Sequence, residues 1–247
     1  NLKVCLVEKN KVGGATSSWS TKLIHGGLRY LENYEFRLVR ESLKEREIIK
    51  KIANDIISPI PFIIPHFPKQ RPKWLIQLGL FIYDHLGGKS SLPKSKRINI
   101  KKEIPNVLKN EFKTGFQYFD LQVDDKKLVE LNINDAKKRG ALIIENNKVI
   151  NVKRNIDHWT ITLNDKTTLN TKILINASGP WINNVLNNII NLNSKKSIRL
   201  VKGSHIITEK LYEQNKAFTL QNTDNRIVFV IPYKDKYSLI GTTEKEV

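Results

Sequence analysis

The sequence LKVCLVE, residues 2–8, is an apolar run that ends in an acid. Such a run is typical of a buried strand in a parallel sheet. In a dinucleotide-binding βαβ unit, an acid ends the second strand and binds the ribose about 20 residues after a GxGxxG turn. Glu8 fits that position, and the spacing then places the glycine-rich turn before residue 1. On these residues alone, an ordinary surface acid at the end of a strand is the alternative for Glu8.

Hydrophobic periodicity predicts helices after this strand. The first runs from Asn33, its expected N-cap, to Ala53, and others lie around 74–85 and over 123–140. Acids at the start of 123–140, bases at its end and Gly140 just beyond it match helix-terminus preferences. The apolar face of the first helix is expected to hold Phe36, Val39, Leu43, Ile48, Ile49 and Ile52.

Strands are predicted through most of the second half of the chain. They are expected at 141–146, 148–154, 159–163, 171–177, 199–208, 226–233 and 237–243. Seven of the nine prolines lie in residues 56–118, which predicts an irregular region with short strands there. The whole pattern favours an α/β fold (α+β overall), in which a Rossmann-like nucleotide-binding lobe accompanies an antiparallel lobe. We expect residues 1–55 and 116–190 in the first lobe, and residues 56–115 and 191–247 in the second.

The charge balance is strongly basic, with 42 Lys and Arg against 24 Asp and Glu, or +18. The basic residues are scattered, which favours compositional drift over a dedicated polyanion partner. Zinc-ligand spacing and aromatic residues set in basic strands are both absent, so nucleic-acid binding is disfavoured. The apolar stretch 56–68, followed by Lys69, Arg71 and Lys73, is a candidate contact with an anionic membrane, and burial of this stretch is the alternative.

The single cysteine, the lack of a long apolar run and the first residue of the chain further limit the possible classes of protein. Cys5 is the single cysteine, which excludes disulfides and Cys-based metal sites within the chain, and its apolar surroundings predict burial. No run of about eighteen apolar residues occurs, which argues against a transmembrane helix. The chain begins with Asn1 and holds no methionine, so we expect either that its start has been removed or that it is a piece of something larger.

The stretch STKLIHGGLRYLE, residues 20–32, sets two glycines beside His25, Arg29 and Tyr30. Glycines allow positive φ or close approach to a flat group, and the guanidinium of Arg29 suits a phosphate or carboxylate. A glycine turn before a helix, with Arg29 in solvent, fits the same residues.

Longer strings of residues resolve this choice. GGATSSWSTKLIHGGLRYLENYEFRLVRESLKERE (13–47) resembles FAD-dependent glycerol-3-phosphate dehydrogenase, a membrane-associated flavoenzyme. The same is true, in order along the chain, of GLFIYDHLGG, YFDLQVDDKKLVELN, NASGPW, VKGSHI, NTDNRIVFVIPY and IGTTE. The implied fold is that of the D-amino-acid-oxidase/glutathione-reductase-2 type, with a truncated FAD-binding lobe and an antiparallel substrate lobe.

The resemblance implies a set of FAD-binding residues. Glu8 would hold the adenosine ribose, and Val149 would contact adenine through its backbone. Thr16, Ser17 and Ser18 would approach the pyrophosphate. The residues expected around the flavin ring are Lys22, Leu23, His25, Gly26, Gly27, Ala177, Gly179 and Trp181.

For the substrate, the resemblance implies that Arg29 pairs with the phosphate of glycerol 3-phosphate and that Tyr30 lines the pocket. His205 is the candidate catalytic residue, accepting the proton of the C2 hydroxyl, although a buried structural histidine fits the same residue equally well. The product would be dihydroxyacetone phosphate, with hydride transfer to FAD and electrons passed on to membrane quinone. No metal site is expected.

The resemblance also implies surroundings and alternatives. The protein is expected in the cytoplasm, peripheral on the inner face of the cytoplasmic membrane, and a homodimer is an open option. The chain resembles an internal fragment that lacks the GxGxxG turn and the C-terminal part, so we expect it to bind FAD poorly and to turn over slowly on its own. An inactive remnant of this family and a related FAD-dependent amino-acid oxidoreductase are the competing hypotheses.

Overall fold

The structure is a computed structural model that describes residues 2–67, 71–192, 195–196, 198–222 and 226–246. The chain forms two compact units. The first unit comprises Asn1–Ser20, Asp125–Val201 and Glu246–Val247, and the second comprises Thr21–Asp124 and Lys202–Lys245. These bounds differ from the expected ones, because residues 21–55 and 116–124 pack in the second unit.

A mostly antiparallel eight-stranded sheet forms the centre of the second unit. Its order is β11-β14-β13-β12-β3-β5-β2, and β4 also pairs with β5. The strands are β2 (Leu23–Ile24), β3 (Ile57–His66), β4 (Lys96–Asn99), β5 (Thr114–Val123), β11 (Ile206–Glu209), β12 (Ala217–Gln221), β13 (Ile227–Tyr233) and β14 (Tyr237–Gly241).

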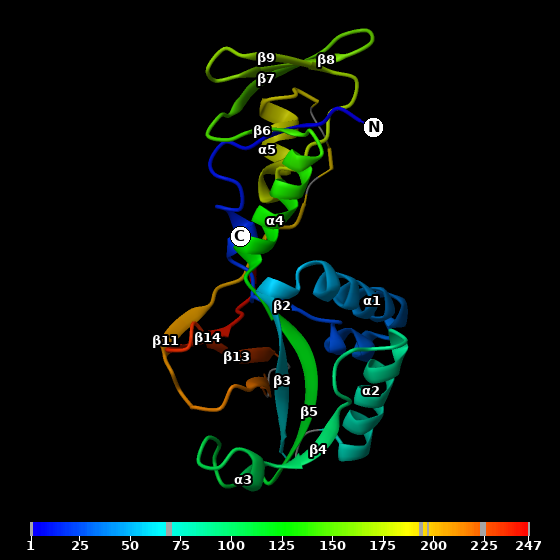
Figure 1. Cartoon of the computed structure of the whole chain (residues 1–247), viewed down its shortest axis with the longest axis vertical. Helices are drawn as coiled ribbons and strands as arrows, with labels where there is room; N and C mark the ends of the chain where they lie inside the picture. Colours follow the sequence, from blue (N-terminus) through cyan, green and yellow to red (C-terminus); the bar gives the residue numbers. More distant parts are fainter. Residues whose placement is uncertain (1, 68–70, 193–194, 197, 223–225, 247) are drawn as a thin grey trace. The chain divides into compact units, whose positions relative to one another are not determined.

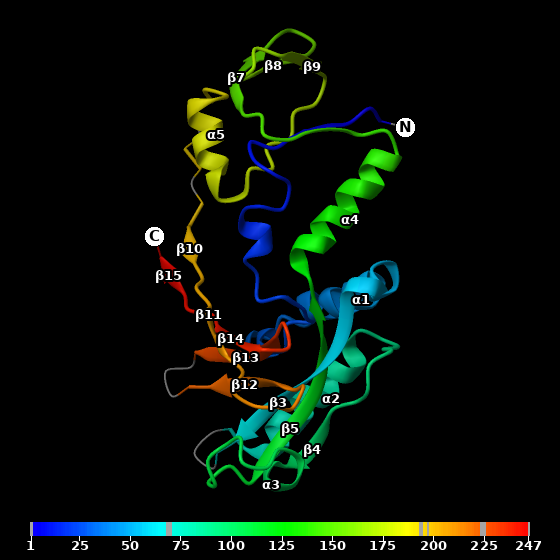
Figure 2. The same cartoon turned by 60° about the vertical axis from the view of Figure 1, so that its left-hand side comes forward.

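The longest pairing in this sheet joins β3 and β5, which lie side by side in Figures 1 and 2. Their antiparallel register runs over ten residue pairs, from Ile57–Val123 to His66–Thr114. The prediction of an irregular region with short strands was therefore wrong here. It was wrong because Pro59, Pro61 and Pro65 occupy alternate positions, so their missing N–H groups all face the same neighbouring strand. The ladder to β5 is then free to continue.

The same pairing corrects the membrane hypothesis for residues 56–68. Nearly all of β3 from Ile60 onward is buried in the sheet, so its apolar side chains are not available to a bilayer. Of the accompanying cations, Lys69 lies outside the described residues. No helix in the described ranges combines the length and the apolar run needed to span a bilayer.

The two faces of the sheet support two apolar clusters. Alternate residues Ile60, Phe62 and Ile64 of β3 face one cluster, which also receives side chains of two helices. Ile63, of the opposite phase, joins the other cluster with Ile98 and residues around the short helix α3 (Ile100–Glu103). This period of two is what a strand buried on both faces requires.

Helices α1 (Phe36–Ile52) and α2 (Lys73–Leu86) supply the first of these clusters, through Val39 and Leu43 of α1 and Leu80 and Tyr83 of α2. Both helices lie on the same side of β3 and β5 (Figure 1). The predicted helix start at Asn33 was wrong, because Leu28–Asn33 forms the 3-10 helix η2 and Tyr34 adopts a left-handed conformation. The predicted apolar face was half right, since Phe36, Ile48 and Ile52 are exposed.

In the first unit, β1 (Cys5–Val7) pairs in parallel with β6 (Leu142–Ile144), as a nucleotide-binding lobe requires. The parallel pairing was predicted, but the predicted burial was wrong, because Cys5 and Leu6 are both exposed. Helix α4 (Asp125–Lys138) confirms the helix predicted over 123–140, with Asp125 in its first turn and Gly140 at positive φ beyond its end.

A three-stranded antiparallel sheet completes the first unit, from β7 (Val149–Arg154), β8 (Trp159–Leu163) and β9 (Thr168–Thr171). Its apolar face packs against residues that follow helix α5 (Ile182–Asn188). The strand predicted at 171–177 was wrong beyond Thr171, because no described strand pairs with Ile173–Ala177. The remaining elements are η1 (Thr16–Ser18), η3 (Asn54–Ile56), η4 (Gly179–Trp181), β10 (Val201–Lys202) and β15 (Lys245–Glu246).

Gly26 lies where α1 and α2 pack against the turn that follows β2. A Cβ added to Gly26 would approach Leu43 Cγ to 2.6 Å and the Tyr83 hydroxyl to 2.8 Å, both too close for a real side chain. Gly79, within α2, has no such neighbour, because nothing lies within 4 Å of an added Cβ. Substitution by alanine should therefore change the free energy of unfolding differently at Gly26 and at Gly79.

We predict that Gly26→Ala destabilises the chain by about 1–3 kcal/mol, because the buried neighbours have no room to move away. The matched change Gly79→Ala should stabilise it by about 0.5–1 kcal/mol, since alanine is the better helix former. Urea unfolding curves of both variants measure these changes. A Gly26→Ala variant as stable as the unmodified chain would contradict the close packing of the turn.

Candidate functional site

The second unit contains an open cavity of about 600 Å³ between η2, α2 and the sheet. Its walls are mainly apolar, with Phe62, Leu80 and Phe229 among them. A smaller set of polar side chains faces the same space, comprising Thr21, His25, Arg29, Tyr30, Glu32, Arg71, Asp120, Thr219, Gln221, Arg226, Thr242 and Glu244. A mostly apolar cavity with a few convergent polar groups is typical of a small-molecule site.

The HGG turn presents His25 to this cavity. Gly27 adopts the left-handed conformation with φ 71°, and a Cβ there would come within 3.0 Å of the Tyr30 ring. The Gly27 N–H donates to Nδ1 of His25 at 3.0 Å, which leaves the proton of a neutral imidazole on Nε2. Both glycines thus have reasons within the chain itself, one steric and one conformational.

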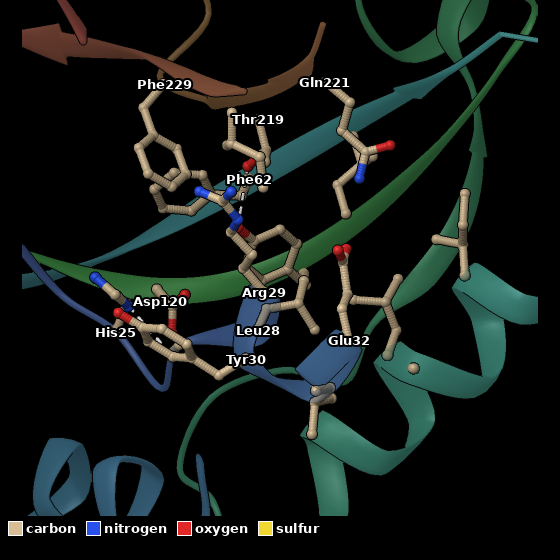
Figure 3. A pocket seen from close by; sticks show the side chains of 18 of the residues that line it. His25, Leu28, Arg29, Tyr30, Glu32, Phe62, Asp120, Thr219, Gln221 and Phe229 are labelled. Carbon is tan, nitrogen blue, oxygen red and sulfur yellow. Dashed lines mark hydrogen bonds between the residues drawn. The ribbon is translucent and has the colours of Figure 1, made fainter. Parts of the chain in front are cut away.

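Arg29 and Tyr30 follow on η2 and line the same cavity. Figure 3 shows the Arg29 guanidinium extending toward Phe62 and Thr219, with His25, Tyr30 and Asp120 grouped beside it. Arg29 forms no ion pair with a carboxylate of the described residues, whereas Arg71, on the same cavity, pairs with Glu32. Arg29 is therefore available to an anionic ligand.

A buried polar network lies behind the turn. The Asp120 carboxylate accepts hydrogen bonds from Arg46 Nη1 at 2.7 Å and from the Tyr83 hydroxyl at 2.8 Å. The Tyr83 oxygen in turn accepts the Gly26 N–H at 2.7 Å. Asp120 is 3% exposed and Arg46 4% exposed, so the ion pair is almost fully removed from water.

Burial dominates the electrostatics of this network. Burial raises the pKa of Asp120, and the nearby Arg46 and His25 only partly oppose that rise. Burial and the Asp120 charge also raise the pKa of Tyr83 well above its usual 10.0, so its hydroxyl keeps its proton and remains a donor.

His205 does not itself line the cavity. Its Nε2 lies 3.1 Å from the hydroxyl of Thr21, which does line it. Burial lowers the pKa of His205 below its ordinary 6.5, and the charge of Lys22 lowers it further. The ring is therefore neutral at pH 7 and able to accept a proton from the cavity through the Thr21 hydroxyl.

The structure brings part of the predicted cofactor set together in the first unit. Glu8 directly follows β1, and its side chain accepts the Asn10 N–H at 3.0 Å. Lys9 Nζ lies 4.9 Å from the Trp181 ring centroid, so the turn after β1 adjoins the NASGPW turn. Gly179 in that turn has φ 56° and open space around it. Ala177 is exposed.

The hydroxyl residues of η1 lie near the start of α4. Ser20, two residues beyond η1, donates from its hydroxyl to Asp125 Oδ2 at 2.7 Å and so anchors the segment to that helix. Thr16 and Ser17 are exposed, and Ser18 donates to the Gly13 carbonyl. Val149 begins β7, opposite Leu163. β7 belongs to a different sheet from β1, the strand that Glu8 follows, and Val149 packs in the same apolar cluster as Val7.

The remaining predicted cofactor residues, Lys22, Leu23 and Gly26–Gly27, lie in the second unit. Leu23 lines the cavity and belongs to β2, an edge strand of the sheet. An edge strand leaves backbone N–H and C=O groups on its outer side without partners in the sheet, and Lys22 enters it with φ 62°. A sheet edge beside an apolar wall fits the rim of a flavin ring, and Glu8 directly after a strand fits the ribose.

Sequence reasoning missed Arg46, Tyr83, Asp120 and Thr219. A signal for Asp120 was present, because a single carboxylate stands among apolar residues in FQYFDLQV and must find a buried partner. Tyr83 and Arg46 gave no such signal, since each lies at an ordinary position of an amphipathic helix. Among the described residues, no group of three or more His, Cys, Asp or Glu is arranged to hold a metal.

Comparison with known proteins agrees with this geometry. Residues 1–247 match the FAD dependent oxidoreductase (DAO) family. The chain is 45% identical to a glycerol-3-phosphate dehydrogenase of Pseudomonas aeruginosa, over 99% of this chain and 48% of that protein. It is 44% identical to D-erythritol 1-phosphate dehydrogenase of Brucella abortus, over 98% of this chain and 50% of that protein.

The fold is similar to that of glycerol-3-phosphate dehydrogenase from Bacillus halodurans complexed with FAD, with a TM-score of 0.72 and 24% identity. That match covers 100% of this chain and 43% of the other. The chain thus spans about half the length of these relatives. The predicted resemblance, the oxidoreductase fold and FAD as the family's cofactor are confirmed. The chain belongs to the FAD dependent oxidoreductase family and is a homologue of its glycerol-3-phosphate dehydrogenases.

Proposed function

We propose that this chain supplies the substrate pocket of an FAD-dependent dehydrogenase that oxidises sn-glycerol 3-phosphate to dihydroxyacetone phosphate. The observation that carries the proposal is the Arg29 guanidinium, which lies in a mainly apolar cavity without a carboxylate partner among the described residues. The relatives that act on glycerol 3-phosphate support it.

Different residues of the pocket bind different parts of the substrate. Arg29 binds the phosphate through its planar fork of N–H donors, which matches phosphate geometry. Tyr30 closes one wall with its ring. Thr219 and Gln221 lie across the cavity from Tyr30 and offer hydrogen bonds to hydroxyl groups. The apolar remainder excludes water and strengthens each of these contacts.

A neutral histidine accepts the proton of the reacting hydroxyl. We assign it to His205, whose lowered pKa keeps it unprotonated and whose Nε2 reaches the Thr21 hydroxyl on the cavity wall. His25 lines the cavity directly, but its Nδ1 already accepts the Gly27 N–H, so only its N–H side faces a ligand. FAD, when bound, supplies the hydride acceptor.

A four-carbon substrate is the second candidate, because the relative from Brucella abortus acts on D-erythritol 1-phosphate and is 44% identical. The same Arg29 would bind either phosphate, and the extra hydroxyl would meet Gln221 or Glu32. An amino-acid substrate would place a carboxylate on Arg29 instead. An inactive remnant would keep the fold and bind none of the three.

We predict that sn-glycerol 3-phosphate binds the chain and that Arg29→Ala raises its Kd by about 10- to 100-fold, the loss expected for a charged hydrogen-bonded pair. The control is Arg37→Ala, an exposed arginine on α1 that pairs with Glu41. Isothermal titration calorimetry measures both variants.

D-Erythritol 1-phosphate and L-proline, titrated in parallel, rank the alternative substrates. Tighter binding of the four-carbon phosphate would replace the proposed substrate, and preference for the amino acid would overturn the phosphate assignment. Absence of binding by all three ligands would favour the inactive remnant. Equal loss in Arg29→Ala and Arg37→Ala would show that Arg29 has no special role.

We predict that His205 titrates below pH 6.5 and that Lys22→Gln raises its pKa without restoring 6.5, since burial is the larger cause. The unfolded chain then binds more protons than the folded one just below pH 6.5, so stability should fall as the pH drops there. NMR titration of the His205 imidazole measures its pKa in the unmodified chain and in Lys22→Gln, with Lys101→Gln on α3 as the control. Urea unfolding at several pH values measures the change in stability. A pKa at or above 6.5 would remove the basis for His205 as the proton acceptor.

Peripheral membrane contact is proposed through α2 in place of residues 56–68. Trp74 and Phe81 are 65% and 60% exposed on this helix, next to Lys73 at its start. Exposed aromatic residues beside a cation suit an anionic membrane interface.

We predict that vesicles containing phosphatidylserine sediment the chain at low salt, and that the double change Trp74→Gln and Phe81→Gln abolishes this. Trp19→Gln, at an exposed tryptophan of the first unit, is the control. Binding that survives the α2 changes would contradict the proposal. Quinone as electron acceptor, a homodimer, a cytoplasmic location and weak FAD binding by the chain alone stay predictions from the resemblance.

A further inference from the structure

We propose that Asp120, Tyr83 and Arg46 are positioning residues for the pocket: they hold the Gly26–Gly27 turn from behind and so fix how His25 and Arg29 face the substrate. This inference rests on the proposed function for its consequence on binding. The part of the inference that concerns the turn itself depends only on hydrogen bonds within the second unit.

The Tyr83 hydroxyl is the central contact. It donates to both Asp120 oxygens, at 2.8 and 3.0 Å, and it accepts the Gly26 N–H at 2.7 Å. A hydroxyl offers one proton, and here Asp120 takes it, which leaves the lone pairs of Tyr83 for Gly26. The carboxylate therefore determines the direction in which the hydroxyl bonds.

Arg46 fixes the carboxylate from the other side. Its Nη1 donates to Asp120 at 2.7 Å and to the Phe119 carbonyl at 3.2 Å. Its Nη2 donates to Glu47 and to the Ser90 hydroxyl, each at 3.3 Å. Glu47 is itself held by Ser90 and Ser91. Asp120 is thus anchored to both α1 and the loop after α2.

The turn has little freedom once these contacts form. Gly26 is held at its N–H by Tyr83, and its α-carbon packs against Leu43 so closely that a Cβ would not fit. His25 precedes this point directly, and Arg29 lies three residues beyond it. A shift of Gly26 would therefore move the two cavity-facing side chains on either side of it.

A purely structural role explains this network poorly. A buried ion pair loses so much solvation that well-packed apolar residues in its place are often equally stable. Asp120 also lines the cavity, and the nearby His25 lowers the pKa of its carboxyl, against the larger effect of burial. The directional hydrogen bond to Gly26 is the property that an apolar replacement would lack.

The test is Tyr83→Phe, which removes the central hydroxyl and keeps the ring in contact with Tyr118. Tyr212→Phe is the matched control, because the Tyr212 hydroxyl also bonds a backbone group, the Val230 carbonyl, but its side chain packs in the other apolar cluster. Hydrogen exchange of the Gly26 amide, followed by NMR, reports the hold on the turn. Calorimetric Kd values for sn-glycerol 3-phosphate report its effect on binding, and thermal unfolding reports stability.

We expect Tyr83→Phe to speed exchange at Gly26 and to raise the Kd, each by about tenfold, the usual effect of one buried hydrogen bond. Tyr212→Phe should leave both unchanged even where it lowers the unfolding temperature as much. Unchanged exchange and Kd in Tyr83→Phe would overturn the inference, as would equal changes in both variants. If the unmodified chain binds no glycerol 3-phosphate, the proposed function fails, and the exchange rate alone then decides the hold on the turn.

Discussion

A carboxylate buried where two helices and a turn meet the central sheet constrains much of the second unit. Asp120 cannot remain in that position without Arg46, because a buried charge without a partner costs several kcal/mol. Arg46 requires α1 to pack at one particular rotation, and Tyr83 requires the same of α2. The Asp120 side chain on β5 therefore couples the placement of both helices to the sheet, and through Gly26 it reaches the site.

The two glycines of the HGG turn show how one sequence pattern can have two causes. Gly26 is required because Leu43 and Tyr83 leave no room for a side chain, and Gly27 because its backbone is left-handed. The sequence suggests close approach to a flat ring, which is a different reason for the same residues. Both reasons can hold together, since the side of the turn away from the helices faces the cavity.

Much of the fold was predictable where the signal is local. Helix α4 was predicted because its acids, bases and terminal glycine all agree, and the α2 helix because its apolar run is long. Strand β3 was misjudged because its prolines mark irregularity unless their shared phase is noticed. Strand β12 was missed, and residues 171–177 were overpredicted, because strands depend on a neighbour that sequence spacing does not specify. In the site, exposed Arg29 and His25 were identified, but the buried residues that hold them were not.

The environments of three arginines explain why composition says little about the ligand. Arg46 is neutralised by Asp120, and Arg71 by Glu32, so neither adds much field to the cavity. Arg29 lacks such a carboxylate among the described residues, and its guanidinium extends toward Phe62 in the cavity. The net charge counts the three arginines equally, whereas of these three only Arg29 lacks a carboxylate partner in the described part of the chain, a place that a phosphate could take. Because Arg29 follows the HGG turn by two residues, its aim depends on the same buried carboxylate that orients the helices.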